Sequence, residues 1–195
     1  MKKLTKEILT KILDNTEEMI DSNRFDAFYR YVYSALQDFT AVGEVTEFVL
    51  SAGIDPLEYM NSVPIAYLAN TEDIENIEIP SNIKVIKRSA FADSALREIT
   101  FAGPIEQIVD NAFYHCESLK SVKLPDGTKF IGDLVFANSG LESLEIPVSV
   151  EQIGNNIILG TKCKPIYLGT MEQWDLVEKP KVPSDALLRR IEIAG

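Results

Sequence analysis

One short apolar pattern recurs five times along this chain at an almost constant spacing. Each copy holds two apolar residues separated by one other residue, and the first residues of successive copies lie 22, 23, 22 and 22 positions apart. A unit this short has too small an apolar face to fold alone, so successive units must stack around one continuous core. The sequence therefore predicts a solenoid with about five short parallel strands. The pairs are Ile77 and Ile79, Ile99 and Phe101, Val122 and Leu124, Leu144 and Ile146, and Ile166 and Leu168.

The rest of the unit repeats in the same register. A proline, which ends a strand because it donates no hydrogen bond, follows the pair at Pro80, Pro125 and Pro147 and slides to Pro104 in the second unit. Apolar residues then return on the second side of the coil, followed by a small-plus-aromatic step. We expect all of these side chains to point inward and the rings to stack as a ladder. They are Ile83 and Ile86, Ile105 and Ile108, Val150 and Ile153, and then Ala90-Phe91, Ala112-Phe113, Val135-Phe136 and the degenerate Ile157-Ile158.

Read as one motif, Ile-x-Ile-Pro followed by Val-x-x-Ile-Gly-x-x-Ala-Phe-x-x-Cys-x-x-Leu resembles the BspA-like class of bacterial leucine-rich repeats over roughly residues 74–178. The resemblance implies a curved right-handed solenoid that binds other macromolecules, commonly at cell surfaces. Residues 166–174 also resemble the strand, Gly-Thr turn and Trp helix that end such arrays, which implies a C-terminal helical cap. Lys87 and Val109 depart from the family's glycine. The residues that carry the motif are Leu124-Pro125, Phe130-Ile131-Gly132, Ala112-Phe113, His115-Cys116, Leu119, Ile146-Pro147, Val150 and Ile153-Gly154.

The first 72 residues follow a helical period instead. Apolar residues between Phe25 and Phe39 recur at the spacing of one buried helix stripe, and similar stripes precede and follow them. We therefore predict an α+β protein: a helical bundle over 1–72, repeats over 73–178, and a tail with a short helix over 179–195. The bundle either caps the open end of the solenoid or forms a second binding module. The stretch 63–73, where Ala66-Tyr67 resembles the Ala-Phe step, is a candidate half-repeat.

The adjacent His115 and Cys116 suggest catalysis, but the repeat register favours a structural interpretation. Cys116 has the same offset from its aromatic residue as Ser94, Ser139 and Thr161, which marks a small buried turn position. Cys163 falls where other units carry Leu96, Leu119 and Leu141, so it is expected in the core as a free thiol. One histidine and two cysteines are too few for a zinc site. We therefore predict a non-enzymatic protein with no catalytic residue, metal or cofactor.

The surface of the strands is the candidate binding site. Side chains alternate across a strand, so the residue between the two apolar ones must face solvent. This column comprises Glu78, Thr100, Lys123, Glu145 and Tyr167, and the column beside it comprises Asn76, Glu98, Ser121, Ser143 and Pro165. We predict that the first column binds a partner and that Tyr167 is its anchor, because tyrosine is enriched in binding hot spots.

Charge narrows the class of partner. The net charge is −11, with 6 basic against 12 acidic residues in 1–72 and 13 against 18 thereafter. Both halves repel phosphate, which argues against direct binding to nucleic acid or to an anionic membrane and favours a protein partner with a basic surface. Because Lys6, Glu7 and Lys11 interrupt the apolar residues after Met1, no signal peptide is expected and the predicted location is the cytoplasm. Three functions remain open: an adaptor or scaffold, an acidic inhibitor of a nucleic-acid-binding enzyme of phage or mobile-element type, and a cell-surface adhesin-like protein.

Overall fold

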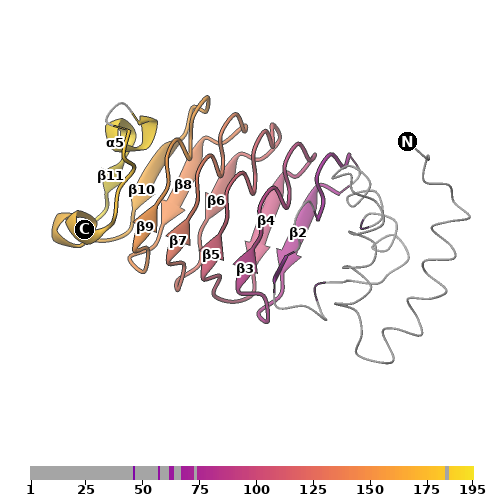
Figure 1. Ribbon diagram of the computed structural model, residues 1–195, viewed down its shortest axis with the longest axis horizontal. Coiled ribbons are helices and arrows are strands. Elements are labelled where there is room, and N and C mark those ends of the chain that lie inside the picture. The colour runs from indigo at the N-terminus through magenta and orange to yellow at the C-terminus, as the bar shows by residue number, and fades with distance from the viewer. Residues whose placement is uncertain (1–45, 47–56, 58–61, 64–66, 73, 183–184) are drawn as a thin grey trace, which may run out of the picture.

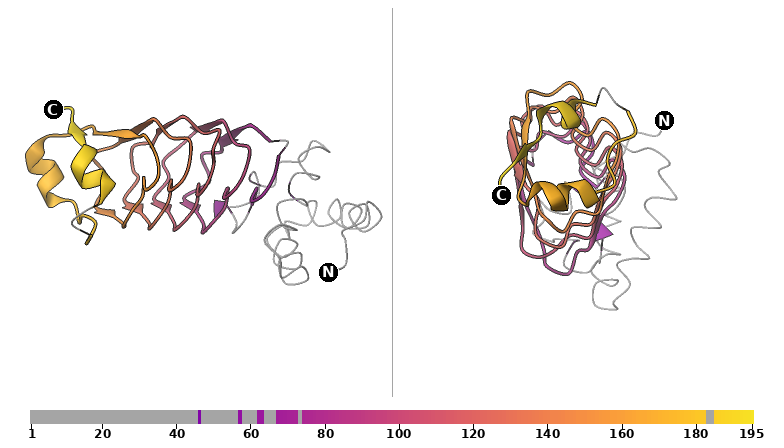
Figure 2. Two further views of the ribbon diagram at one scale, coloured as in Figure 1. Left: turned by 90° about the horizontal axis from the view of Figure 1, so that it is seen from above. Right: turned by 90° about the vertical axis from the view of Figure 1, so that its left-hand side faces the viewer.

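The chain winds through stacked coils, and successive coils add strands to two sides of one solenoid (Figures 1 and 2). The structure, a computed structural model, describes residues 46, 57, 62–63, 67–72, 74–182 and 185–195. The first side carries β2 (Asn76–Ile79), β4 (Glu98–Phe101), β6 (Ser121–Lys123), β8 (Ser143–Ile146), β10 (Lys164–Tyr167) and β11 (Glu192–Ile193). The second side carries β1 (Ser62–Val63), β3 (Val85–Ile86), β5 (Gln107–Ile108), β7 (Phe130–Ile131) and β9 (Gln152–Ile153).

Every paired strand in these sheets is parallel. The predicted parallel-strand solenoid is therefore confirmed, and the second side proves to be a sheet in its own right. The helical bundle predicted over 1–72 lies outside the described residues, apart from isolated positions and the stretches 62–63 and 67–72.

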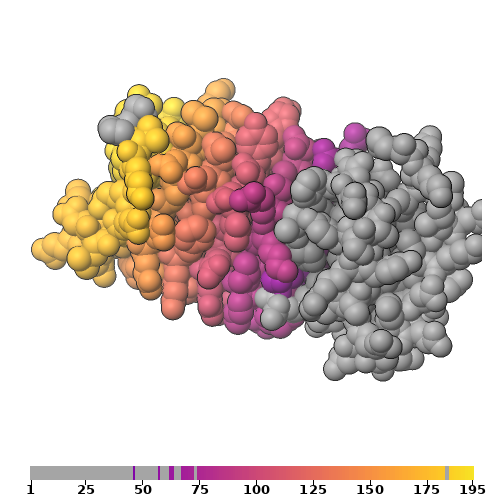
Figure 3. Space-filling view, in the orientation of Figure 1, coloured from indigo at the N-terminus to yellow at the C-terminus, as the bar shows by residue number. Residues whose placement is uncertain are grey.

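The core is a ladder of aromatic rings, as the small-plus-aromatic step predicts. The Phe91 and Phe113 ring centroids are 5.1 Å apart and the planes differ by 6°, while Phe113 and Phe136 are 5.3 Å apart and differ by 8°. All three rings are fully buried. Backbone bonds fix the same spacing, because Phe91 N donates to Ala112 O and Phe113 N donates to Val135 O, each over 2.8 Å. Figure 3 shows the coils packed directly against one another.

The predicted half-repeat before the first full unit is present in the residues that the structure describes there, but its register differs by one residue from the predicted one: Leu68, not Tyr67, takes the position of the aromatic residue. Val63 on β1 pairs with Ile86 on β3, and both side chains are fully buried. Leu68 N donates to Ala90 O over 2.7 Å. Tyr67 closes the ring ladder, since it meets Phe91 edge-on with centroids 6.1 Å apart and planes at 83°.

The sheet on the first side is interrupted between β4 and β6. Hydrogen-bonded pairing joins β2 to β4, and separately β6 to β8, β10 and β11. This is the place where the repeat lengthens to 23 residues and the proline moves to Pro104. The extra residue lies between Cys116 and Leu119, because Phe113 stands six residues before its leucine whereas Phe91 and Phe136 stand five before theirs. At the end of β4, Gly103 packs tightly on Ser81, and Pro104 has no N–H to donate. The expected strand face is therefore two segments instead of one unbroken sheet.

The last unit contradicts the predicted register. Pro165 pairs with Leu144 and Tyr167 pairs with Ile146, so these two side chains point inward and Ile166 lies beside Glu145 on the outer face. Tyr167 is 1% exposed, whereas Leu168 is 38% exposed. The final unit is thus one residue shorter than the others, and a shift of one residue moves every side chain to the other face of a strand. The predictions of Tyr167 and Pro165 as outward residues are wrong.

The C-terminal residues close the solenoid. Helix α4 (Met171–Leu176) begins with a capping box in which Gln173 N donates to the Thr170 hydroxyl and Thr170 N donates to Gln173 Oε1. Trp174 is buried with its ring centroid 5.2 Å from that of Tyr167, so the expected Gly-Thr turn and Trp helix are confirmed.

The tail then adds a coil that has no repeat motif. Glu178 bridges to Gln152 beside β9, helix α5 (Ala186–Arg190) follows, and β11 pairs in parallel with β10. The same coil is tied to the array by side chains, since Asn155 Oδ1 accepts from Lys181 N over 2.9 Å and Asp185 accepts from Asn156 N.

The ring ladder generates a stability prediction. Phe113→Ala removes a ring that touches both neighbours, so the free energy of unfolding should fall by about 3–5 kcal/mol. Glu145→Ala alters only a half-exposed residue in a surface ion pair, and it should change stability by no more than about 0.5 kcal/mol. Urea denaturation followed by circular dichroism measures both values. Small, equal effects would contradict the central place of the ladder.

Candidate functional site

The outward face of the first side is the surface that the sequence nominates. Glu78, Thr100 and Lys123 are exposed there and Glu145 is half-buried. Glu78 lies beside Thr100 across β2 and β4, and Lys123 lies beside Glu145 across β6 and β8. The place expected for Tyr167 belongs to the half-buried Ile166, and Glu192 on β11 extends the column by one residue. We call this column, from Glu78 to Glu192, the strand face.

The charges on the strand face are unevenly paired. Lys123 Nζ lies 3.1 Å from Glu145 Oε2, so these two charges neutralise each other. The carboxylates of Glu78 and Glu192, and that of Glu98 in the adjoining column, make no hydrogen bond or ion pair with any residue described in the structure. Both ends of the strand face, at β2 and β4 and at Glu192 on β11, are therefore acidic and free to attract cationic groups, whereas its centre is electrically balanced.

A second polar region lies on the turns that connect the two sides of the coil. These turns place two residues per coil in the left-handed backbone conformation, and the second of the two has φ of 56° at Asp93, 58° at His115, 57° at Asn138 and 75° at Gly160. Asp, Asn, His and Gly adopt this conformation more readily than other residues. Together with Tyr114 they line a hollow of about 450 Å³, which we call the turn hollow.

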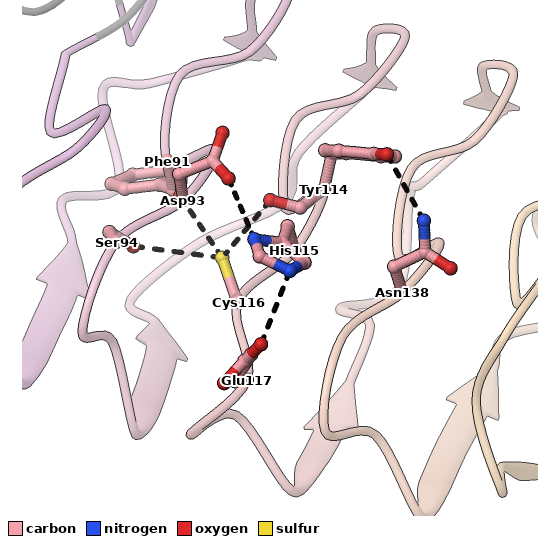
Figure 4. Close-up of polar contacts among 8 residues, drawn as sticks. All are labelled: Phe91, Asp93, Ser94, Tyr114, His115, Cys116, Glu117 and Asn138. Carbon is pink, nitrogen blue, oxygen red and sulfur yellow. Dashed lines mark hydrogen bonds and ion pairs between the residues drawn. The ribbon is translucent and has the colours of Figure 1, made fainter.

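The polar groups of the turn hollow satisfy one another (Figure 4). His115 Nδ1 lies 2.7 Å from Asp93 Oδ1, and His115 Nε2 lies 3.2 Å from Glu117 Oε1. Asn138 Nδ2 donates to the Tyr114 hydroxyl over 3.0 Å. Both imidazole nitrogens thus face carboxylates, so the ring is held by its neighbours and does not face a nucleophile.

The thiol of Cys116 points into the core beneath this region. Its Sγ donates to Phe91 O over 3.0 Å and lies 3.6 Å from the Ser94 hydroxyl. Burial raises the pKa of the Cys116 thiol to about 11, which leaves it protonated at neutral pH. A thiolate is the form that attacks an electrophile, so this residue lacks the character of a catalytic nucleophile.

The structural interpretation of both cysteines is confirmed. Ser94, Ser139 and Thr161 occupy the position of Cys116 in their coils and are buried. Ser139 and Thr161 each donate to the backbone oxygen three residues earlier, over 2.7 Å. Cys163 is fully buried, as are the leucines of the same column, and burial raises the pKa of its thiol to about 12. Both thiols are free.

The described part of the chain has neither a metal-binding cluster nor a membrane-spanning helix. No group of three or more His, Cys, Asp or Glu side chains there is arranged to hold a metal ion. Within the same residues, no helix has the length and apolar character needed to cross a bilayer.

Comparison with known proteins identifies the repeat. The profile of the BspA type leucine rich repeat region matches residues 58–170 in six copies. The chain belongs to the BspA-type leucine-rich repeat family. Repeats of this family are typically non-enzymatic modules for protein interaction, because stacked units create extended binding surfaces.

One solved structure is similar to part of this BspA-type chain. A crystal structure of a leucine-rich repeat protein from Eubacterium ventriosum matches with 23% sequence identity and a TM-score of 0.45. The match covers 64% of this chain and 30% of that chain, so it spans less than a third of that protein's length. Among curated proteins, no sequence matches.

The buried thiol gives a pH-dependent prediction. Burial raises the pKa of Cys116 from 9.0 to about 11, so the unfolded thiol loses its proton before the folded one. Between pH 9 and 11 the unfolded state then binds fewer protons, and the free energy of unfolding must fall as the pH rises. Cys116→Ser should fold normally, because serine occupies this position in two other coils, and it should lose less stability between pH 8 and pH 10.5. Urea titrations at both pH values test this, and equal losses in both proteins would contradict it.

Proposed function

We propose that this chain is a non-enzymatic adaptor that docks a protein partner on the strand face, through Glu78, Thr100, Lys123 and Glu145. The observation that carries the proposal is the alignment of these outward side chains on strands whose inward side chains are committed to the core. Packing constrains the inward residues, and nothing in the core constrains the outward ones. The outward residues can therefore be of any type that a partner requires.

The chemistry of the strand face favours a basic partner. Its unpaired carboxylates are Glu78 and Glu192, Glu98 adds a third in the adjoining column, and the whole chain carries a net charge of −11. Such a surface attracts Lys- and Arg-rich proteins over distances of about 10 Å at moderate salt. The same charge opposes nucleic acid and anionic membranes as direct ligands. A cytoplasmic adaptor is the simplest protein with these properties.

Because Tyr167 points inward, we propose Ile166 as the anchor of the strand face in its place. It is half-buried on the outer face between Glu145 and Glu192. A partner that covers Ile166 would remove its side chain from water, and apolar burial contributes favourably to association.

Affinity capture with paired charge-reversal variants tests the proposal. The full chain serves as bait in lysate of the source cell, and bound proteins are identified by mass spectrometry. Glu78→Lys/Glu98→Lys should abolish capture of a basic partner that wild type retains at low salt. Glu106→Lys/Glu151→Lys, which makes the same change of charge on the second side of the coil, is the matched control and should retain that partner.

Two results would contradict the proposal. Equal capture of the partner by both double variants would show that the strand face does not take part in the interaction. A partner of neutral or acidic composition, bound independently of salt, would remove the electrostatic basis. A basic nucleic-acid-binding enzyme that loses activity on capture would instead identify the chain as an inhibitor.

A further inference from the structure

The second side of the coil carries a hollow that the protein-docking role does not use. It has a volume of about 380 Å³, near the small end of the range of about 300–1,000 Å³ for ligand sites. It lies across three neighbouring strands, β5, β7 and β9, and we call it the Phe130 hollow. The lining residues are Glu106, Gln107, Lys129, Phe130, Glu151 and Gln152.

The fold does not require an aromatic ring at the centre of this hollow. Phe130 is directly paired with Gln107 on one side and Gln152 on the other, and its neighbour Ile131 is the residue that points into the core. Other half-buried apolar side chains, such as Ile77 and Phe101, pack against the core cluster, but Phe130 is not one of them. In the strands described on this side, the equivalent positions hold Ser62, Val85, Gln107 and Gln152.

The polar side chains around Phe130 are unpaired. Those of Glu106, Gln107, Lys129, Glu151 and Gln152 make no hydrogen bond or ion pair with any residue that the structure describes. The turn hollow is the opposite case, because His115, Asp93 and Asn138 are all engaged by neighbours. The Phe130 hollow therefore keeps both donors and acceptors available for a ligand.

We propose that the Phe130 hollow binds a saccharide. A sugar ring has an apolar C–H face and a rim of hydroxyl groups, each of which both donates and accepts hydrogen bonds. The hollow offers the matching surface: one apolar ring at its centre, two amides in the adjacent strands about 4.8 Å away on either side, and carboxylates with an ammonium group beside them.

Other ligand classes fit this surface less well. Glu106 and Glu151 flank Lys129, so the hollow has no single sign of charge with which to select an ion or a phosphate. A protein hot spot is a larger desolvated cluster of aromatic and aliphatic groups, and here one ring stands among polar side chains. Because the hollow and the strand face lie on different strands of the coil, this inference does not depend on the proposed protein partner.

Saturation-transfer-difference and ¹H–¹⁵N NMR titrations test the proposal with three soluble probes: cellopentaose, maltopentaose and triacetylchitotriose. At least one probe should bind the full chain with a dissociation constant on the order of 1 mM and shift the amides of Ile108, Ile131 and Ile153. Phe130→Val introduces the side-chain type that β3 carries at this position and should weaken binding at least about tenfold. Phe130→Tyr should preserve binding, and Gln107→Ala/Gln152→Ala should weaken it.

Tyr114→Leu is the matched control, because it removes a half-buried aromatic ring from the turn hollow and should leave saccharide binding unchanged. Circular dichroism and urea midpoints establish whether each variant is folded. If Phe130→Val does not fold, the weaker saccharide binding expected of Gln107→Ala/Gln152→Ala becomes the deciding measurement. Absence of binding by all three probes at about 10 mM would overturn the proposal. So would undiminished binding by Phe130→Val, loss of binding in Tyr114→Leu, or loss of the captured protein partner in Phe130→Val.

Discussion

The stacking of Phe91, Phe113 and Phe136 is the interaction on which the rest of the structure depends. The rings of neighbouring coils stack with centroids 5.1 and 5.3 Å apart, so the ladder sets the same distance between coils that the backbone bonds require. Side-chain packing and hydrogen bonding thus favour one pitch. Where the rings stop, other residues close the core: Tyr67 meets the first ring edge-on, and Ile158 replaces the next ring at the far end. A solenoid of this kind is stabilised between neighbours, not through a central nucleus.

A fixed pitch also explains which residues were predictable from the sequence. Inward positions recur because each must fill the same space in successive coils, so proline, aliphatic pairs and the aromatic step identified the core columns, and the Ser/Cys/Thr register identified the role of Cys116. The register predicted for the last unit was wrong because Ile166-Tyr167-Leu168 also fits the pattern of an apolar pair around an outward residue. Hydrophobicity does not separate the two registers. The structure selects the one that places Tyr167 against Trp174 and buries Pro165.

The closing coil was not predictable from a repeat because it contains none. Glu178 continues the second side by backbone pairing alone, and β11 is two residues long, too short to show an alternating pattern. What joins this coil to the array is a chain of side-chain oxygens that accept backbone N–H groups of the next coil. Asp110 accepts from Asp133, Asp133 accepts from Asn155, and Asn155 accepts from Lys181. Gly132 and Gly154 belong to the same feature, because a Cβ at either position would come within 2.5 Å of the Asp110 or Asp133 carboxylate. In the first unit, Arg88 takes the place of Asp110, and Val109 takes the place of Gly132 in the coil that follows. Arg88 places no carboxylate against Val109, so a side chain is tolerated there although the family prefers glycine.

Outward residues follow different rules, and this is why the repeat predicts the position of a binding surface but not its ligand. On the first side, Lys123 and Glu145 satisfy each other while Glu78, Glu98 and Glu192 have no partner among the described residues, so electrostatic attraction is concentrated at the two ends of the strand face. On the second side, Phe130 departs from the small or polar residues of its column without serving the core. A substitution at either place leaves the ring ladder untouched, since the inward residues of the same strands hold the coil. The residues of the two surfaces can therefore change independently, and a solenoid with one repeated interior can carry one ligand on each side.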